Sequence, residues 1–80
     1  MLSYNIKRGN PDGSTTFLTR VDAKIIPREG DILHLYAANA SATDTPDEFI
    51  VVAVIHDIIR GENAARHANT QIVSVIVKEI

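Results

Sequence analysis

The 80-residue sequence contains no cysteine. Disulfide bonds, thiolate zinc sites and cysteine nucleophiles are therefore excluded, and small secreted domains usually depend on such cross-links. Residues 1–8 lack the apolar stretch of a signal peptide. The longest apolar run, residues 49–55, is far shorter than the roughly 20 residues of a membrane helix. These absences predict a soluble protein located in the cytoplasm.

Tryptophan is also absent, and aromatic residues make up only 5% of the chain, although 45% of it is hydrophobic. Valine and isoleucine supply much of this apolar content. Such β-branched side chains favour strands, because they pack well on a pleated surface. A chain of this length holds one core, so we expect a single domain over residues 1–80.

The N-terminal part of the chain has the pattern of a β-hairpin. Residues 3–8 and 14–21 are rich in strand-forming side chains. Between them, Pro11, Asp12 and Gly13 stand in the order that suits a type I turn with a glycine bulge. We therefore predict an N-terminal hairpin over residues 1–23.

The remainder, residues 24–80, is expected to form the core of a barrel. Proline and glycine within residues 27–31 predict a tight turn. A short strand over residues 32–36 and an exposed loop over residues 37–47 follow it. Residues 71–80 form a closing strand, preceded by a connection with at most one short helical turn around its alanines. The prediction is thus mainly β, with five or six strands.

Residues 46–60 carry two conflicting patterns. Thr45, Pro46 and Glu48 would suit a helix start, and Gly61 would suit a helix end. However, nine of the eleven residues from 49 to 59 are apolar, and seven of these are valine or isoleucine. A helix that is apolar on every side must be buried on every side, which a small chain hardly permits. We therefore predict a strand.

Three motifs resemble those of small SH3-like barrel proteins found among bacterial and phage open reading frames. The first is an I-P-x-x-G-D opening at residues 26–31. The second is an F-x-V-x-x-V-x-H strand at residues 49–56, and the third is the alternation of Val73, Val75 and Val77. The resemblance covers residues 24–80 and implies an SH3-like barrel. It also implies a small phage or mobile-element type binder or inhibitor of a host protein, although the fold does not select a ligand.

Two strands carry apolar residues on both faces. The spacing of Val51 and Val54 indicates a β-bulge, which turns a strand around a barrel corner. Small barrels normally alternate apolar and polar residues, so a second apolar face needs a cover. Either the N-terminal hairpin folds over it, or it is a contact surface for a partner or a second copy. The interface candidates, with two rim residues last, are Ile50, Val52, Ile72, Ile76, Ile80, His56 and Arg60.

Basic residues in and beside the hairpin support an alternative. If they converged, Tyr4 or Phe17 would offer a base-stacking partner, as in barrels that bind nucleic acid. The candidates for this site are Lys7, Arg8, Arg20, Lys24 and Arg28. The net charge of −2 opposes this interpretation, because phosphate-binding domains usually carry a marked basic excess. Interleaved aspartates and glutamates dilute the patch further.

Catalytic and metal sites are not expected. His56 and Asp57 would resemble half of a hydrolytic site, but adjacent strand residues point to opposite faces. The spacings of His34, His56 and His67 match no metal-binding motif. We therefore predict a protein that is not an enzyme and has no cofactor and no metal.

The sequence thus predicts a non-catalytic protein-binding module that self-associates as a homodimer. A nucleic-acid-binding barrel is the first alternative. A structural subunit of a larger assembly is the second.

Overall fold

The computed structural model describes residues 2–41, 44–61 and 70–80. Its secondary structure consists of strands, and no helix occurs in this described part of the chain. The five strands are β1 (Leu2–Gly9), β2 (Thr15–Ala23), β3 (Ile32–Leu35), β4 (Asp47–Ile59) and β5 (Thr70–Glu79).

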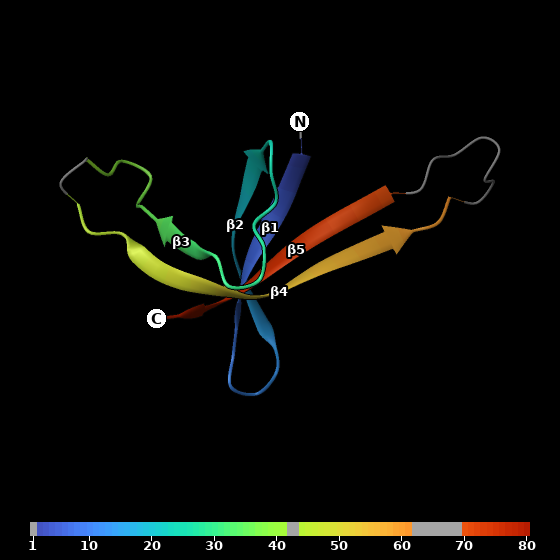
Figure 1. Cartoon of the computed structure of the whole chain (residues 1–80), viewed down its shortest axis with the longest axis horizontal. Coiled ribbons are helices and arrows are strands. Elements are labelled where there is room, and N and C mark those ends of the chain that lie inside the picture. The colour runs from blue at the N-terminus through green and yellow to red at the C-terminus, as the bar shows by residue number, and fades with distance from the viewer. Residues whose placement is uncertain (1, 42–43, 62–69) are drawn as a thin grey trace.

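All five strands belong to one sheet, in the order β2-β1-β5-β4-β3. β1 and β5 pair in parallel, whereas the other three pairs are antiparallel. The sheet is strongly curled into a half-barrel (Figure 1), which is consistent with a small SH3-like barrel. The mainly β prediction is therefore confirmed.

Two glycines in positive φ set the direction of the chain between strands. Gly13 has a φ of 87° and Gly30 a φ of 93°, values that glycine adopts without the steric cost of a Cβ atom. In the first turn, the Gly13 amide donates to the Asn10 carbonyl at 3.0 Å. In the second, the Gly30 amide donates to the Val51 carbonyl at 2.8 Å, which fixes this turn against β4.

Residues 47–59 form the strand β4, as the sequence predicts. The register between β4 and β5 shifts between Val51 and Ala53, so Val52 is an extra residue on β4. This shift is the predicted β-bulge. A bulge bends its strand and increases the local twist, and β4 bends where it crosses the centre of the molecule in Figure 1.

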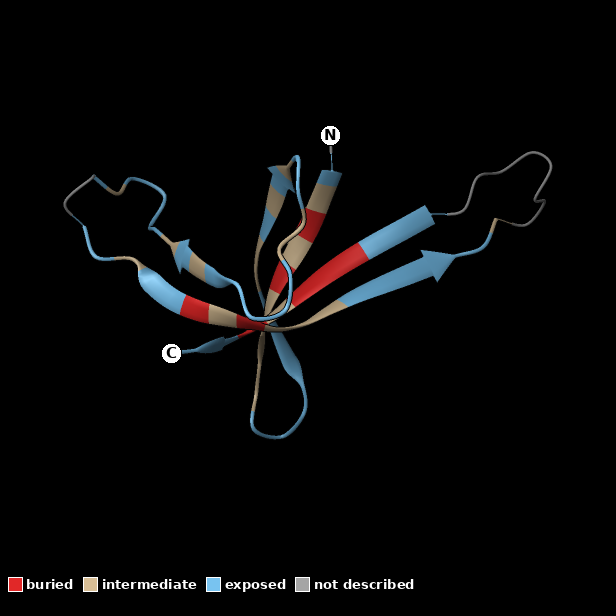
Figure 2. Ribbon diagram, viewed as in Figure 1, coloured by how far each residue is buried: buried red, intermediate tan, exposed pale blue. Residues whose placement is uncertain are grey.

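The core lies on one face of the curled sheet, which we call the inner face. Its buried side chains are Tyr4, Ile6, Phe49, Val51, Val73, Val75 and Val77. They come from β1, β4 and β5, the three central strands of the sheet. Figure 2 shows the same distribution, with buried residues near the crossing of the strands and exposed residues toward the ends.

The N-terminal hairpin does not fold over the opposite face of the sheet. β1 pairs with β5 from Asn5 to Arg8, and β2 pairs with the other side of β1. The hairpin therefore widens the sheet by two strands. The helical turn expected around Ala64 and Ala65 lies outside the described residues. In the ranges that are described, no helix has the length and apolarity needed to cross a membrane.

Candidate protein-binding surface

The face of the sheet opposite the core, here called the outer face, carries apolar side chains on three strands, with polar residues such as Lys78 and Ser74 between them. Ile76 of β5 lies at its middle, beside Ala53 of β4 and Lys7 of β1. Ile50 lies beside Ile32 of β3. The outer face therefore extends apolar surface from β3 across β4 to β5, where a soluble single-layer sheet would normally be polar.

Exposure separates the centre of the outer face from its margins. Ile50 and Ile76 are half-buried, because neighbouring strands flank them on both sides. Ile72 is 39% exposed, Ile32 is 50% exposed and Phe17 is 58% exposed. The outer face thus has a partly covered centre and an exposed apolar margin.

The structure places some of the predicted interface residues together on this face. Ile50, Ile72 and Ile76 share it, as the pairing register requires. Val52 is the bulge residue and is half-buried. Ile80 follows β5 and is exposed, and its amide donates to the Glu48 carbonyl at 3.2 Å.

The two predicted rim residues lie elsewhere. His56 is opposite Val73, a core residue, so its side chain is on the inner face. Its Nδ1 atom lies 2.7 Å from Nε2 of Gln71, within hydrogen-bond distance. Arg60 directly follows the end of β4 and is exposed. The change of face at His56 follows from the bulge, which shifts the alternation of β4 by one residue.

Sequence reasoning missed two contributors to the outer face, Phe17 and Ile32. Phe17 pairs with Lys7 after the register of β1 and β2 shifts between Ile6 and Lys7. Ile32 lies on a strand of only four residues. In such a short strand, the alternation of apolar and polar residues does not show which side chains face the core. The pairing partner was the missing information in both cases.

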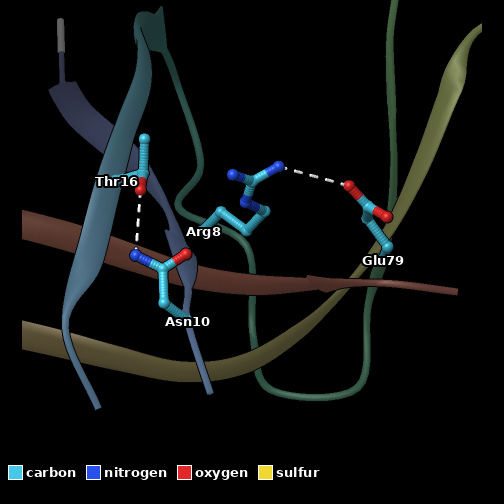
Figure 3. A network of polar contacts seen from close by, with 4 residues as sticks. All are labelled: Arg8, Asn10, Thr16 and Glu79. Carbon is cyan, nitrogen blue, oxygen red and sulfur yellow. Dashed lines mark hydrogen bonds and ion pairs between the residues drawn. The ribbon is translucent and has the colours of Figure 1, made fainter. Parts of the chain in front are cut away.

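The five candidate basic residues do not converge on one surface. Lys7 and Arg20 share the outer face with Phe17. Arg8 projects from the other face of β1, where its Nη1 atom lies 3.3 Å from Oε1 of Glu79 (Figure 3). Lys24 follows the end of β2, and Arg28 lies in the turn before β3. Only two of the five cations therefore lie beside the exposed aromatic ring.

The candidate catalytic pair is divided between the two faces. Asp57 pairs with Ile72 of the outer face, whereas His56 is on the inner face. His34 is also on the outer face, opposite Glu48. His67 lies outside the described residues. Within the described ranges, no three His, Asp or Glu side chains gather in a way that would hold a metal ion.

Two pKa values depart from their ordinary range, and both have local causes. Burial raises the pKa of the Tyr4 hydroxyl, because desolvation opposes the phenolate. The hydroxyl of Ser14, 2.6 Å from the Asp12 carboxylate, and the Ser14 amide lower the pKa of Asp12. Neither group lies among the apolar residues of the outer face.

Protein-family models, curated proteins and solved structures give no match to this chain. Its function is therefore inferred from the surface of the molecule itself.

Proposed function

We propose that this chain is a non-catalytic protein-binding module that packs its outer face against another polypeptide, beginning with a second copy of itself. The observation that carries this proposal is the unusual amount of surface that the chain leaves exposed. Domains normally close their core between two layers of secondary structure. This chain supplies one curled sheet.

The excess can be estimated. The accessible surface of the chain is 6243 Å², whereas a monomeric protein of 8.8 kDa is expected to expose about 4,800 Å². The Cα radius of gyration is 15.0 Å, against about 12 Å for a compact domain of this length. A stable interface buries about 800 Å² on each partner. The surplus surface is therefore large enough to form one.

The chemical nature of the outer face favours a protein partner. Isoleucines lie at its centre and its margin, and exposed apolar patches of this kind mark contact surfaces. The charges near its centre are Lys7, which pairs with Ile76, and Lys78, which pairs with Ile50. A surface of this type loses water when an apolar surface of the partner covers it.

The test is the absolute mass of the purified protein, measured by light scattering on a sizing column in low and high salt. We expect a dimer or a larger species that persists in high salt, because apolar contacts are not screened. Ile76→Asp should halve the mass by removing the outer-face contact. Ile25→Asp adds the same charge at an exposed isoleucine between β2 and β3, and should leave the mass unchanged.

Ile76 is half-buried, so circular dichroism must first show that Ile76→Asp remains folded. Ile72→Asp combined with Ile80→Asp provides a second variant at exposed positions of the same surface. The proposal would be wrong if the folded variants kept the mass of the unmodified chain. It would also be wrong if the unmodified chain were a monomer and captured no protein after nuclease treatment.

A second candidate function is nucleic-acid binding, which one observation favours. Phe17 is exposed beside Lys7, and Arg20 lies on the same face. A stacking ring with flanking cations suits a single strand of nucleic acid. Binding to a fluorescent oligonucleotide should then fall with increasing salt, and Phe17→Ala should weaken it more than Arg28→Ala. Equal binding by both variants would exclude this site.

A further inference from the structure

β1 and β5 pair only over Asn5–Arg8 and Ser74–Val77, so their ends beyond this pairing have no strand neighbour on that side. The described sheet has three further exposed edges, and two of these carry features that prevent pairing with another strand. Edge strands present unpaired backbone amides and carbonyls, which proteins protect with bulges, charges, prolines or short length. β2 has a register shift opposite Ile6 and Lys7 and carries Arg20 and Asp22. β3 has only four residues and lies next to the turn that contains Pro27.

The third edge is the part of β4 beyond its bulge, residues 53–59. β3 pairs with β4 only from Asp47 to Ile50, and the turn before β3 adds Val51. Beyond this point, the described part of the chain places no strand on that side of β4. These seven residues include no proline, lysine or arginine and only one charged residue, Asp57. Their pairing with β5 is regular.

This edge also carries more exposed apolar surface than the other two edges. Ile55 is 45% exposed, Ile58 is 61% exposed and Ile59 is 55% exposed. Together with residues 70–73 of β5, residues 55–59 of β4 form a two-stranded ribbon, here called the arm. It extends away from the packed centre in Figure 1, and its far end is exposed in Figure 2, whereas Val73 at its base is buried. A two-stranded ribbon is marginally stable alone in water.

We infer that residues 53–59 of β4 pair antiparallel with the same residues of a second copy, so that two half-barrel sheets become one continuous sheet. This interface runs along an edge of the sheet and not across its outer face, and it goes beyond the proposed function. A second copy is the occupant because an antiparallel edge is complementary to itself about a two-fold axis. Such an axis also brings exposed isoleucines from both arms together on each face of the new sheet.

The edge carries little charge that would oppose this partner. Asp57 is the one charged side chain within the edge, and Arg60 follows at its end. When residues 53–59 pair with their own copy, Asp57 faces Ile55 of the second copy, and Arg60 lies beyond the paired residues. A foreign strand would gain the same backbone hydrogen bonds, but the self-complementary pattern requires no further component.

The absence of cysteine makes the test direct, because a single introduced cysteine reports only on its own contacts. We would replace residues 55–59 with cysteine one at a time and measure intermolecular disulfide formation under mild oxidation. Two cysteines bridge only when their Cβ atoms approach to about 4 Å. In a two-fold antiparallel pair, the two copies of a residue separate by about 7 Å for each step away from the axis.

Edge pairing therefore predicts that the yield of intermolecular disulfide is highest at one position and falls at the positions on both sides of it. Stacking of two outer faces predicts a different pattern, in which Ile55, Asp57 and Ile59 react and the intervening positions do not. Arg20→Cys on the protected edge of β2 is the matched control and should remain unbridged. Ile32→Cys reports on the outer face, so the two interfaces are read separately.

A charge variant gives an independent readout of mass. Ile58→Lys places an edge-protecting lysine at an exposed position of the inner face, and should halve the mass of the assembly by removing the edge contact. Ile25→Lys should not. A single yield maximum together with this loss of mass would support the inference. An alternating pattern, no bridging along the arm, or an unchanged mass for Ile58→Lys would overturn it, whatever the result for Ile76→Asp.

Discussion

Two antiparallel ribbons extend from the packed centre of this molecule, and the surface at the end of one is polar whereas that of the other is apolar. The turn end of the β1–β2 hairpin is polar. Asn10 donates to the Ser14 and Thr16 hydroxyls at 3.1 and 2.9 Å, and Asp12 accepts from Ser14. The arm formed by β4 and β5 is exposed to a similar degree, but isoleucines dominate its surface.

The difference shows that exposure alone does not identify a binding surface. The hairpin end satisfies its polar groups internally, so water is a suitable neighbour for it. The arm carries exposed isoleucines, which are typical of a core strand, but no second layer of structure covers them in the described part of the chain. Residues 49–51 of the same strand are buried or half-buried, whereas residues 55–59 are exposed. The neighbouring elements, and not the residue types, decide which half of β4 is covered.

The largest effect is expected at the centre on which both ribbons depend. Val75→Ala removes two methyl groups from a fully buried side chain and should lower the free energy of unfolding by about 2–3 kcal/mol. Ile58→Ala in the arm should change it by less than about 0.5 kcal/mol in the monomer. Urea denaturation at low protein concentration measures both values. Equal losses would show that the arm is part of the core.

The next effect concerns the arm and its partner. Raising the protein concentration to about ten times the dimer dissociation constant leaves about one fifth of the chains monomeric, so amide hydrogen exchange at residues 55–59 should slow about fivefold. Exchange at the Gly13 amide, which is hydrogen-bonded within its own turn, should not change. If exchange slowed equally at residues 55–59 and at the Gly13 amide, the effect would be global, and the arm would not differ from the hairpin turn.

The hairpin turn should be sensitive to its backbone and not to a partner. Gly13→Ala forces a Cβ atom into positive φ, although nothing lies within 4 Å of that atom. The variant should lower the free energy of unfolding by about 1 kcal/mol. Gly9→Ala is the control, because its Cβ would make an ordinary contact at 3.6 Å with Ile76. Thermal unfolding of both variants gives the comparison.

The smallest effect is the pH dependence of the same turn. Ser14 lowers the pKa of Asp12 in the folded chain. The ionised carboxylate therefore favours the folded turn at pH values above about 4, and this contribution is lost as the pH falls through the lowered pKa. The Ser14 amide chemical shift should follow this titration. Asp12→Asn should abolish it, and a titration that persists in that variant would contradict the assignment.

Local features of the fold could be predicted from the sequence. The order of Pro11, Asp12 and Gly13 specified the first turn, and the β-branched residues of β4 favoured a strand over a helix. The spacing of Val51 and Val54 predicted the bulge. Each of these depends on the physical preferences of a few adjacent residues, so it is readable without knowledge of the rest of the chain.

Pairings between distant strands could not be predicted in this way. Nothing in residues 5–8 or 74–77 indicates that β1 and β5 lie side by side in parallel. Without that pairing, the hairpin remained a possible cover for the second apolar face. The sequence identified the surplus of isoleucines, but it could not show which of them lie on the outer face and which lie along the unpaired edge of β4.

The last strand of the chain occupies the middle of the sheet. β5 separates the β1–β2 pair from the β3–β4 pair, so these two pairs share no strand until residues 70–79 arrive. During synthesis, the first four strands therefore have apolar surface and no common neighbour. Folding is dominated by contacts between distant parts of the chain, which are slow to form and leave a nascent chain exposed to aggregation. Completion of the centre therefore depends on residues 70–79, which are synthesised after the other four strands.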